Sequence, residues 1–558
     1  MIINLNMDIP VKSFLLNKIY NIKVLFNRGD NMKKLPMGIS TFSKIIENDY
    51  IYVDKTRTIY GMANRVETYF LSRPRRFGKS LLVNTLKELF QGNKELFEGL
   101  YIHDKWDWKE KHPVIHLDFG SRTTTSPEQL ELSLNKFLND TAEDNNIQLE
   151  DTNLLNDKFE ELIKKLYKKT GKKVVVLIDE YDNPIIDCIK NIEIAKENRD
   201  ILSDFYKVLK ATDEYLRFIF LTGVTKFSKT SIFSGLNNVT DITLNNNFSD
   251  ICGYTQDELE NCFKGHIDKF SKDSNTNREK LLSLIEEWYD GYSWDGSTYL
   301  YNPYSILSLF NSGEFSNYWF ETGTPSFLMD FVKNNNGTDV LFKPNTTISG
   351  NFPSFNLKNL DFTTLLLQTG YLTIKEKRVK VGKLTKYELA IPNKEVSGSL
   401  FTSIINEFSN QESTEVNNLA EKILEAIINI DNDSLQEAFD VLVANIPAIL
   451  YGKIKEDIRE ANYHIWFLSW FRLMGFFVIG KNQSSKGYAD MVLKKDNLIV
   501  VCEFKYGLDK SLENLAIEAI NQIKDKKYHE QYLDYNVALL GVAFGDREVK
   551  SIIEDLKL

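Results

Sequence analysis

The clearest alternation of apolar and polar stretches in this chain lies between residues 68 and 90. Residues 68–71 form a short apolar and aromatic run, residues 72–80 are mostly polar or basic, and residues 81–90 carry apolar side chains at helical spacing. This order predicts a strand, a loop and a helix. Because backbone N–H groups and the helix dipole both favour an anion where a loop enters a helix, we expect a phosphate site here.

The surrounding pattern predicts a parallel sheet. Further strands are expected at residues 113–119, 172–180 and 216–221, and helices at residues 42–47, 128–145 and 152–169. The centre of the 172–180 run is Val-Val-Val-Leu-Ile, which is typical of a strand buried on both faces. Strands that alternate with helices imply βαβ units, and therefore an α/β fold with a mostly parallel sheet.

The loop at residues 72–80 ends in residues that can bind a triphosphate. Gly78, Lys79 and Ser80 form the end of a Walker A motif, in which the lysine reaches the outer phosphates and the serine hydroxyl holds Mg²⁺. A complete motif also has glycine five residues before Gly78, where this chain has Arg73. A helix with a basic first turn is the alternative interpretation of this short motif.

The strand at residues 172–180 ends in two carboxylates, Asp179 and Glu180. As a Walker B motif, Asp179 would bind the Mg²⁺ shared with Ser80, and Glu180 would polarise the attacking water. Thr222 ends the next strand and is a candidate sensor of the γ-phosphate, with a simple strand cap as the alternative. The predicted ATP site therefore comprises Gly78, Lys79, Ser80, Asp179 and Thr222, with Glu180 as its catalytic residue.

A second cluster of charged residues lies near the C-terminus. Residues 487–493 and 498–505 predict a hairpin with a polar turn. Glu503 and Lys505 are two apart on the return strand and project from one face, and Asp490 on the partner strand can lie beside them. Asp490, Glu503 and the Phe504 carbonyl would form an oxygen-rich Mg²⁺ site, where Lys505 would orient or deprotonate a water for attack on a phosphodiester.

Six short motifs carry a family resemblance. They lie at residues 35–38 (Leu-Pro-Met-Gly), 52–56 (Tyr-Val-Asp-Lys-Thr), 73–80 (Arg-Pro-Arg-Arg-Phe-Gly-Lys-Ser), 178–182 (Ile-Asp-Glu-Tyr-Asp), 222–224 (Thr-Gly-Val) and 233–238 (Phe-Ser-Gly-Leu-Asn-Asn). From residue 32 onward, the chain resembles the AAA-ATPase-like family that carries a C-terminal PD-(D/E)xK nuclease-superfamily domain. The resemblance implies a P-loop NTPase core and a restriction-endonuclease-like α/β domain.

The resemblance also bears on single residues. It makes Arg73 a family feature, and Ala489 stands where the nuclease motif has a proline that contributes no ligand. It makes Glu460 the expected acid of the outer nuclease motif and Gln522 a candidate substrate-positioning residue. His464, one turn after Glu460 on a predicted helix, is expected to pack rather than bind.

Six segments are expected from the order of these patterns. They are an N-terminal extension (1–31), an AAA-type ATPase core (32–249), a helical lid (250–331), a winged-helix-like region (332–413), a helical connector (414–450) and a PD-(D/E)xK nuclease-like domain (451–558). Residues 32–56 are either a lid over the adenine base or plain N-terminal packing. The basic turn at residues 375–386 is either a wing that contacts phosphates or a solvated hairpin tip.

Composition narrows the environment of the protein. Apolar residues make up 42% of the 558-residue chain and charged residues 26%, and the net charge of −10 argues against nonspecific coating of nucleic acid. Four scattered cysteines form no CxxC pair, which favours reduced thiols in a cytoplasmic or nuclear compartment. The apolar stretch at residues 465–479 is too short to cross a membrane. The family-like sequence starts at Met32, so residues 1–31 are expected to lie outside the fold, an over-called start codon being one explanation.

The sequence therefore predicts an enzyme: an ATP-binding protein and ATPase coupled to a Mg²⁺-dependent nuclease domain that acts on DNA or RNA. The alternative is a nucleotide-switch interaction protein whose C-terminal domain does not cut. A homo-oligomer is compatible with either function, and Arg75 and Arg76 could act within one chain, across a subunit interface or only structurally.

Overall fold

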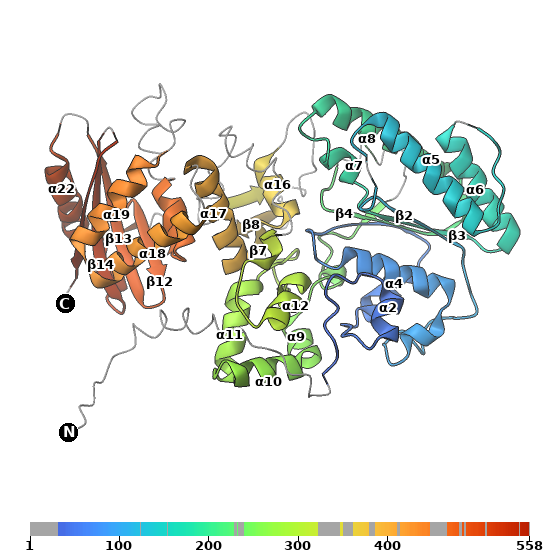
Figure 1. Ribbon diagram of the computed structural model, residues 1–558, viewed down its shortest axis with the longest axis horizontal. Helices are drawn as coiled ribbons and strands as arrows, with labels where there is room; N and C mark the ends of the chain where they lie inside the picture. Colours follow the sequence, from blue (N-terminus) through green and yellow to red (C-terminus); the bar gives the residue numbers. More distant parts are fainter. Residues whose placement is uncertain are drawn as a thin grey trace. The chain divides into compact units, whose positions relative to one another are not determined.

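The computed structural model describes residues 32–122, 124–152, 154–227, 232, 239–321, 346–349, 361–378, 385–409, 413–446, 466–478, 483–484, 487–507, 510–545 and 547–556 (Figure 1). The N-terminal extension, Glu460, His464 and the motif at residues 233–238 lie outside these ranges. The chain forms two compact units, one within Met1–Thr322 and Thr347–Asn393 and the other within Gly323–Thr346 and Lys394–Leu558.

The first unit is built on a five-stranded parallel sheet. Its strands are β1 (Thr68–Ser72), β2 (Val114–Asp118), β3 (Val174–Asp179), β4 (Leu216–Gly223) and β5 (Val239–Asp241), in the order β2-β3-β4-β1-β5. Every neighbouring pair is parallel. Because parallel strands point the same way, the phosphate loop after β1 and the carboxylates after β3 lie at one edge, with β4 between them. The predicted α/β fold is confirmed.

Helices cover both faces of this sheet (Figure 1). One face packs against α4 (Lys79–Gln91), with α2 (Phe42–Glu47) behind it, and the other carries α5 (Pro127–Asp144), α6 (Leu155–Thr170) and α8 (Ile192–Ala211). Local signals set the helix ends. Ser126 accepts a hydrogen bond from the Gln129 amide to begin α5, and Gly171 ends α6 in the left-handed conformation. Helix α8 has no counterpart among the expected helices, although Asn191 caps it in a recognisable way.

A helical region follows the sheet, as the pattern from residue 250 onward predicts. It contains α9 (Gln256–Cys262), α10 (Lys264–Asp273), α11 (Arg278–Tyr289) and α12 (Pro303–Ser312), which share one apolar core. The next described elements are α16 (Phe362–Thr369), β7 (Thr373–Arg378) and β8 (Lys386–Ala390), and β6 (Thr346–Ser349) completes a small sheet in the order β6-β8-β7. This is the expected helix and hairpin of a winged-helix-like region. Its second helix, α17 (Lys394–Ser409), falls in the other compact unit.

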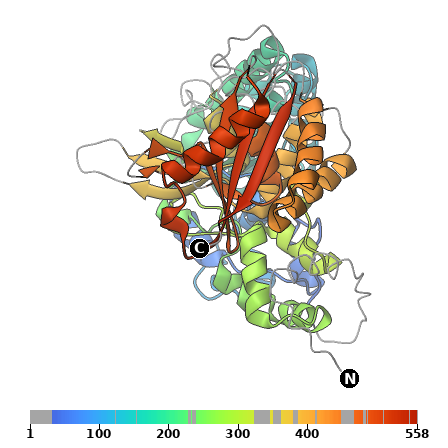
Figure 2. The ribbon, with the colours of Figure 1, turned by 90° about the vertical axis from the view of Figure 1, so that its left-hand side faces the viewer.

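The second unit contains a mixed sheet between two helical layers. The strands are β9 (Phe477–Val478), β12 (Met491–Lys495), β13 (Leu498–Tyr506), β14 (Asn536–Phe544) and β15 (Val549–Asp555), in the order β15-β14-β13-β12-β9. Only the β13–β14 pair is parallel within this sheet. Helix α22 (Leu512–Asp525) covers one face, and α18 (Ser413–Asn429) and α19 (Asn432–Ala444) share a core with the other (Figure 2).

One predicted strand is broken. Residues 487–493 form two strands, because β11 (Gly487–Tyr488) pairs with β10 (Gln483–Ser484) in a separate ribbon and β12 starts only at Met491. Between them, the Asp490 carboxylate accepts a hydrogen bond of 2.9 Å from the backbone N–H of Phe504. A side chain thus replaces a backbone partner at this point, which ends the ladder and turns Asp490 toward β13.

Candidate functional site

The phosphate loop is held in a conformation that its glycine makes possible. Gly78 is the N-cap of α4 and has φ of 93°, a left-handed conformation that costs glycine little. Lys79 is buried, and its Nζ donates a hydrogen bond of 2.9 Å to the carbonyl of Pro74. Burial lowers the pKa of Lys79, while the nearby carboxylates of Glu180 and Asp179 raise it. The lysine therefore lies within the field of the predicted acidic cluster.

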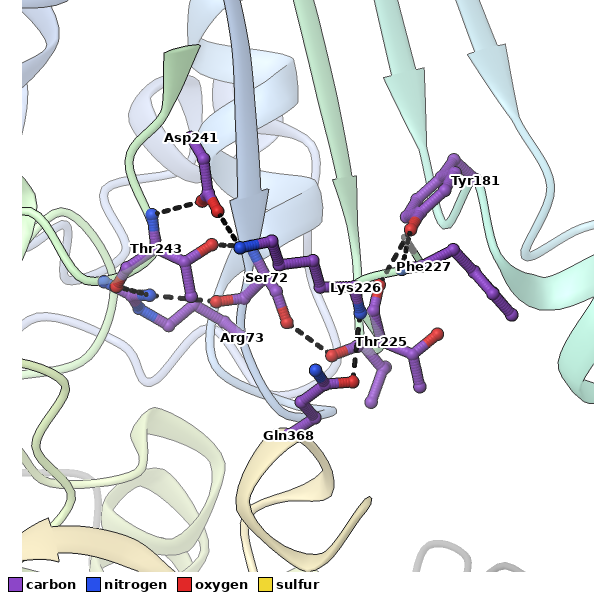
Figure 3. A network of polar contacts seen from close by, with 10 residues as sticks. Ser72, Arg73, Tyr181, Thr225, Lys226, Phe227, Asp241, Thr243 and Gln368 are labelled. Carbon is purple, nitrogen blue, oxygen red and sulfur yellow. Dashed lines mark hydrogen bonds and ion pairs between the residues drawn. The ribbon is translucent and has the colours of Figure 1, made fainter. Parts of the chain in front are cut away.

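Arg73, which replaces a glycine of the complete Walker A motif, faces away from the phosphate position. Its guanidinium is fully buried and donates hydrogen bonds of 2.9 Å to the carbonyls of Ser72 and Thr243 (Figure 3). A third hydrogen bond, of 3.2 Å, goes to the carbonyl of Phe248. It also lies 4.1 Å from the centre of the Trp294 ring, and burial lowers its pKa to about 10. Arg73 is thus a structural residue that ties the loop to its surroundings.

The rest of the loop is anchored by an aromatic side chain. Phe77 is buried and packs edge-on against Tyr292 at 4.9 Å and Trp294 at 5.1 Å. The neighbouring Arg75 and Arg76 are both exposed, and Arg76 lies over the ring of Tyr304. The structure therefore gives Phe77 a packing role and leaves both arginines at the surface.

The carboxylates after β3 lie beside the phosphate loop. Asp179 is 2% exposed, and burial raises its pKa to about 6, while the Ser80 hydroxyl and the Lys79 ammonium lower it. Ser80, Lys79 and Asp179 are thus brought together, as the sequence predicts. A buried carboxylate beside a serine hydroxyl is a donor set that suits Mg²⁺ at a triphosphate, because the ion would offset the cost of burying this charge.

Glu180 is held in an unusual backbone conformation. Its φ is 52°, which is strained for a residue other than glycine. Its Oε2 accepts a hydrogen bond of 2.6 Å from Asn183 Nδ2, and a Cβ added at Gly120 would lie only 2.3 Å from the same oxygen. The sequence predicted neither of these neighbours. Asp118, at the end of β2, pairs in register with Asp179 and also raises its pKa.

Thr222 occupies the expected place on β4, between the strands that carry the two motifs. Its side chain is fully buried, and its Oγ1 has no hydrogen-bond partner among the described residues. A buried hydroxyl normally has a partner, so the unpaired Oγ1 fits the predicted contact with a phosphate or a water. The backbone carbonyl of Thr222 accepts a hydrogen bond of 3.1 Å from the Tyr181 amide, which links β4 to the residue after Glu180.

The N-terminal motif at residues 52–56 makes internal contacts. The Asp54 carboxylate accepts hydrogen bonds from the amides of Thr56 and Tyr101, both at 2.8 Å, and Lys55 forms an ion pair of 2.6 Å with Glu258. These partners all belong to the same compact unit as Asp54 and Lys55. Of the two interpretations of residues 32–56, these contacts support N-terminal packing and not a lid over the adenine base.

The C-terminal cluster is assembled on one side of its sheet. The Lys505 ammonium lies 3.2 Å from Glu503 Oε1 and 2.5 Å from Gln522 Oε1, and Gln522 also donates a hydrogen bond to Glu503. Asp490 is close enough to raise the pKa of Glu503, although burial is the larger cause, and together they raise it to about 7. The structure thus brings together Asp490, Glu503, Lys505 and Gln522.

One carboxylate oxygen of the cluster is buried without a partner within the described ranges. Glu503 is 3% exposed, and its Oε2 has no hydrogen-bond partner among the described residues. In the part of the chain that is described, no group of three or more His, Cys, Asp or Glu side chains is arranged to hold a metal ion. Asp490 and Glu503 fit Mg²⁺, which commonly binds proteins through one or two carboxylates and keeps several waters.

Comparisons with known proteins match both of the regions that carry these clusters. A family model for predicted AAA-ATPases matches residues 36–233, and a model for the PD-(D/E)XK nuclease superfamily matches residues 458–554. An uncharacterized protein from the vnfD 5′ region of Azotobacter chroococcum mcd 1 is 37% identical over 526 residues, which cover 93% of this chain and 98% of the relative. The chain belongs to the AAA-ATPase-like family with a C-terminal PD-(D/E)XK domain.

Two solved structures resemble parts of this AAA-ATPase-like protein at 12% identity. The match to Cdc6p from Pyrobaculum aerophilum covers 65% of this chain and 97% of that protein. The match to the ORC2 protein of Aeropyrum pernix covers 67% of this chain and 93% of that protein. The TM-score is 0.24 in both cases. In the described parts of this AAA-ATPase-like protein, no helix is both long and apolar enough to serve as a transmembrane span.

Proposed function

We propose that this AAA-ATPase-like protein binds and hydrolyses ATP, and that its C-terminal domain is a Mg²⁺-dependent phosphodiesterase that acts on nucleic acid. The observation that supports the second activity is the contact of Lys505 with Glu503 and Gln522, beside Asp490 and around an unpartnered carboxylate oxygen. An ammonium group next to a buried carboxylate is an arrangement that can hold and activate a water.

In the proposed ATP reaction, each residue has a separate task. Lys79 leaves the Pro74 carbonyl and binds the outer phosphates, and Ser80 and Asp179 would hold Mg²⁺. Glu180 orients the attacking water, with its carboxylate fixed by Asn183. A bound Mg²⁺ would neutralise part of the negative charge of the phosphates.

In the proposed phosphodiester reaction, Asp490 and Glu503 would hold the metal ion. As an ammonium group, Lys505 positions a water, and only in its neutral amine form would it take a proton from that water. Gln522 Oε1 holds the lysine Nζ at 2.5 Å. DNA and RNA share this phosphodiester, so either is a candidate partner. All four cysteines of the chain are free, which supports the cytoplasm as the compartment for both reactions.

A second candidate function is a nucleotide switch whose C-terminal domain binds nucleic acid or a partner without cutting. The feature that favours it is the burial of Glu503, which raises the pKa of this carboxyl to about 7 and so weakens its binding of a cation near neutral pH. The two functions differ in one outcome, which is whether a phosphodiester is broken.

A cleavage assay tests the proposal. The purified chain is incubated with duplex DNA, single-stranded DNA or RNA in the presence of Mg²⁺ and ATP, alongside Lys505→Ala, Lys79→Ala and the control Lys524→Ala. Lys524 lies on α22 in the same domain, but its ion pair with Glu554 is exposed. We expect cleavage by the wild type and the control that is lost in Lys505→Ala, and ATP turnover that is lost in Lys79→Ala.

Two results would contradict the proposal in different ways. ATP turnover without cleavage of any nucleic acid would support the switch. Cleavage that survives Lys505→Ala would show that this cluster is not the reacting site. Light scattering with and without ATP measures in the same samples whether the chain forms a homo-oligomer.

A further inference from the structure

The C-terminal end of α16 contacts the loop that follows the predicted sensor strand. Gln368 is 2% exposed, and its Oε1 accepts a hydrogen bond of 3.0 Å from the backbone N–H of Lys226 (Figure 3). Lys226 lies four residues after Thr222, whereas Gln368 lies outside the expected ATPase core of residues 32–249. A residue 142 positions away in sequence therefore holds a segment of the nucleotide site.

The loop held by Gln368 is also bonded to β1 and to the segment that follows β3. Ser72 Oγ donates a hydrogen bond of 2.5 Å to the Val224 carbonyl, and Tyr181 donates one of 2.9 Å from its hydroxyl to the Thr225 carbonyl. The Phe227 amide donates to the same tyrosine hydroxyl at 3.2 Å (Figure 3). A shift of this loop would therefore move the residue next to Glu180.

The turn after Gln368 contacts the phosphate loop itself. Gly370 has φ of 92°, and a Cβ added there would lie 2.8 Å from Cγ of Pro74. Trp319 donates a hydrogen bond of 3.1 Å from its Nε1 to the Arg75 carbonyl, and its ring packs against Tyr371 at 5.2 Å. Because Lys79 binds the carbonyl of Pro74, the residue at position 370 faces the part of the loop that must rearrange when a triphosphate arrives.

We infer that Gln368 and Gly370 are positioning residues of the ATPase site, supplied by the winged-helix-like region. This inference rests on the proposed ATPase activity. Gln368 fixes the sensor loop and thereby the water-orienting segment, so its loss lowers kcat. Gly370 leaves space for the phosphate loop, so a larger residue weakens nucleotide binding.

The first test removes the acceptor at position 368 and keeps its shape. Gln368→Met is expected to lower kcat for ATP about tenfold with KM changed less than twofold, since one buried amide loses its partner. Gln368→Glu keeps an oxygen at the same place and is expected to restore at least half of the wild-type kcat. Gln436→Met is the matched control, because Gln436 accepts from the Ser551 amide at 2.9 Å in the other compact unit.

The second test fills the space at position 370. Gly370→Ala is expected to weaken binding of a fluorescent ATP analogue at least tenfold. Gly171→Ala is the control, because Gly171 also ends a helix with positive φ (67°) but has nothing within 4 Å of an added Cβ. Thermal unfolding compares the Tm of each variant with that of the wild type, to test whether the variant is folded.

The outcomes distinguish the proposed ATPase activity from the positioning roles of Gln368 and Gly370. Wild-type protein that neither binds nor hydrolyses ATP overturns the proposed function and this inference with it. Wild-type turnover that Gln368→Met leaves unchanged overturns this inference alone, and so does binding of the ATP analogue that Gly370→Ala leaves unchanged. A loss of kcat that Gln368→Glu does not restore also overturns it, because the acceptor oxygen would then have no part in the effect.

Discussion

Arg73→Gly restores the glycine of a complete Walker A motif, and we expect it to weaken the protein without improving nucleotide binding. The guanidinium fills a closed site in which three backbone carbonyls accept its hydrogen bonds and the Trp294 ring covers it. None of these contacts faces a phosphate. Glycine would remove all of them and would leave the loop with a freer backbone in the unfolded chain.

The size of the effect follows from these contacts. Hydrogen bonds from a charged donor contribute about 1.5–3 kcal/mol each, and a desolvated cation–π contact adds about 1–2 kcal/mol. Burial opposes them: it lowers the pKa of Arg73 from 12.5 to about 10, and a shift of that size corresponds to about 3 kcal/mol. Because the three hydrogen bonds share one guanidinium group, we take the low end of the range for each. The free energy of unfolding then falls by about 3 kcal/mol, and the freer backbone of glycine lowers it by about 1 kcal/mol more.

Thermal unfolding of the full chain measures this loss. About 3–4 kcal/mol corresponds to a Tm lowered by roughly 4–5 °C for the transition of the first unit. Arg75→Gly is the matched control, because Arg75 lies in the same loop with an exposed side chain and should change Tm by less than about 2 °C. An Arg73→Gly protein with unchanged Tm and tighter ATP binding would refute our interpretation of this residue.

Four further predictions follow from the two sites. Gly120→Ala should lower kcat for ATP about 100-fold with little change in ATP affinity, because the new methyl group displaces the Glu180 carboxylate; Gly61→Ala, which meets nothing within 4 Å, is its control in a turnover assay. Asn183→Ala should lower kcat about tenfold for the same reason, as steady-state kinetics will show. The metal-free second unit should lose stability as pH rises from 4.5 through 7, because folding raises the pKa of Glu503 and the folded form keeps the proton longer. Mg²⁺ affinity by calorimetry should then be about tenfold higher at pH 8 than at pH 6, and Glu503→Gln should remove that difference.

The elements nearest the sites could be predicted because their pattern is local. Strand β3 is apolar and buried on both faces, so its run of valines defines it without reference to the rest of the chain. The helix after the phosphate loop is set by Gly78 and by apolar spacing over thirteen residues. The placement of Asp490 beside Glu503 follows from strand alternation and a short turn, although the break in the strand does not.

The parts that escaped prediction depend on contacts between distant segments. Nothing near Arg73 in sequence shows that its partners are the carbonyls of Thr243 and Phe248, about 170 residues away. The same holds for Gly120, whose missing side chain makes room for a carboxylate from another strand. Asn183 lies only three residues from Glu180, but its effect requires the positive φ of that residue, which its side chain does not favour.

The acidic run after β3 contains a third carboxylate whose contacts distinguish it from the other two. Asp182 is 1% exposed and accepts hydrogen bonds from the amides of Val224 (3.1 Å) and Thr225 (2.6 Å) and from the Thr225 hydroxyl. A carboxylate with three donors has little capacity left for a cation, so Asp182 is poorly suited to hold Mg²⁺. It instead fixes the loop after Thr222 to the segment that carries Glu180. The predicted sensor and the predicted water-orienting residue are therefore joined through one buried side chain, and a nucleotide that moves either of them must move both.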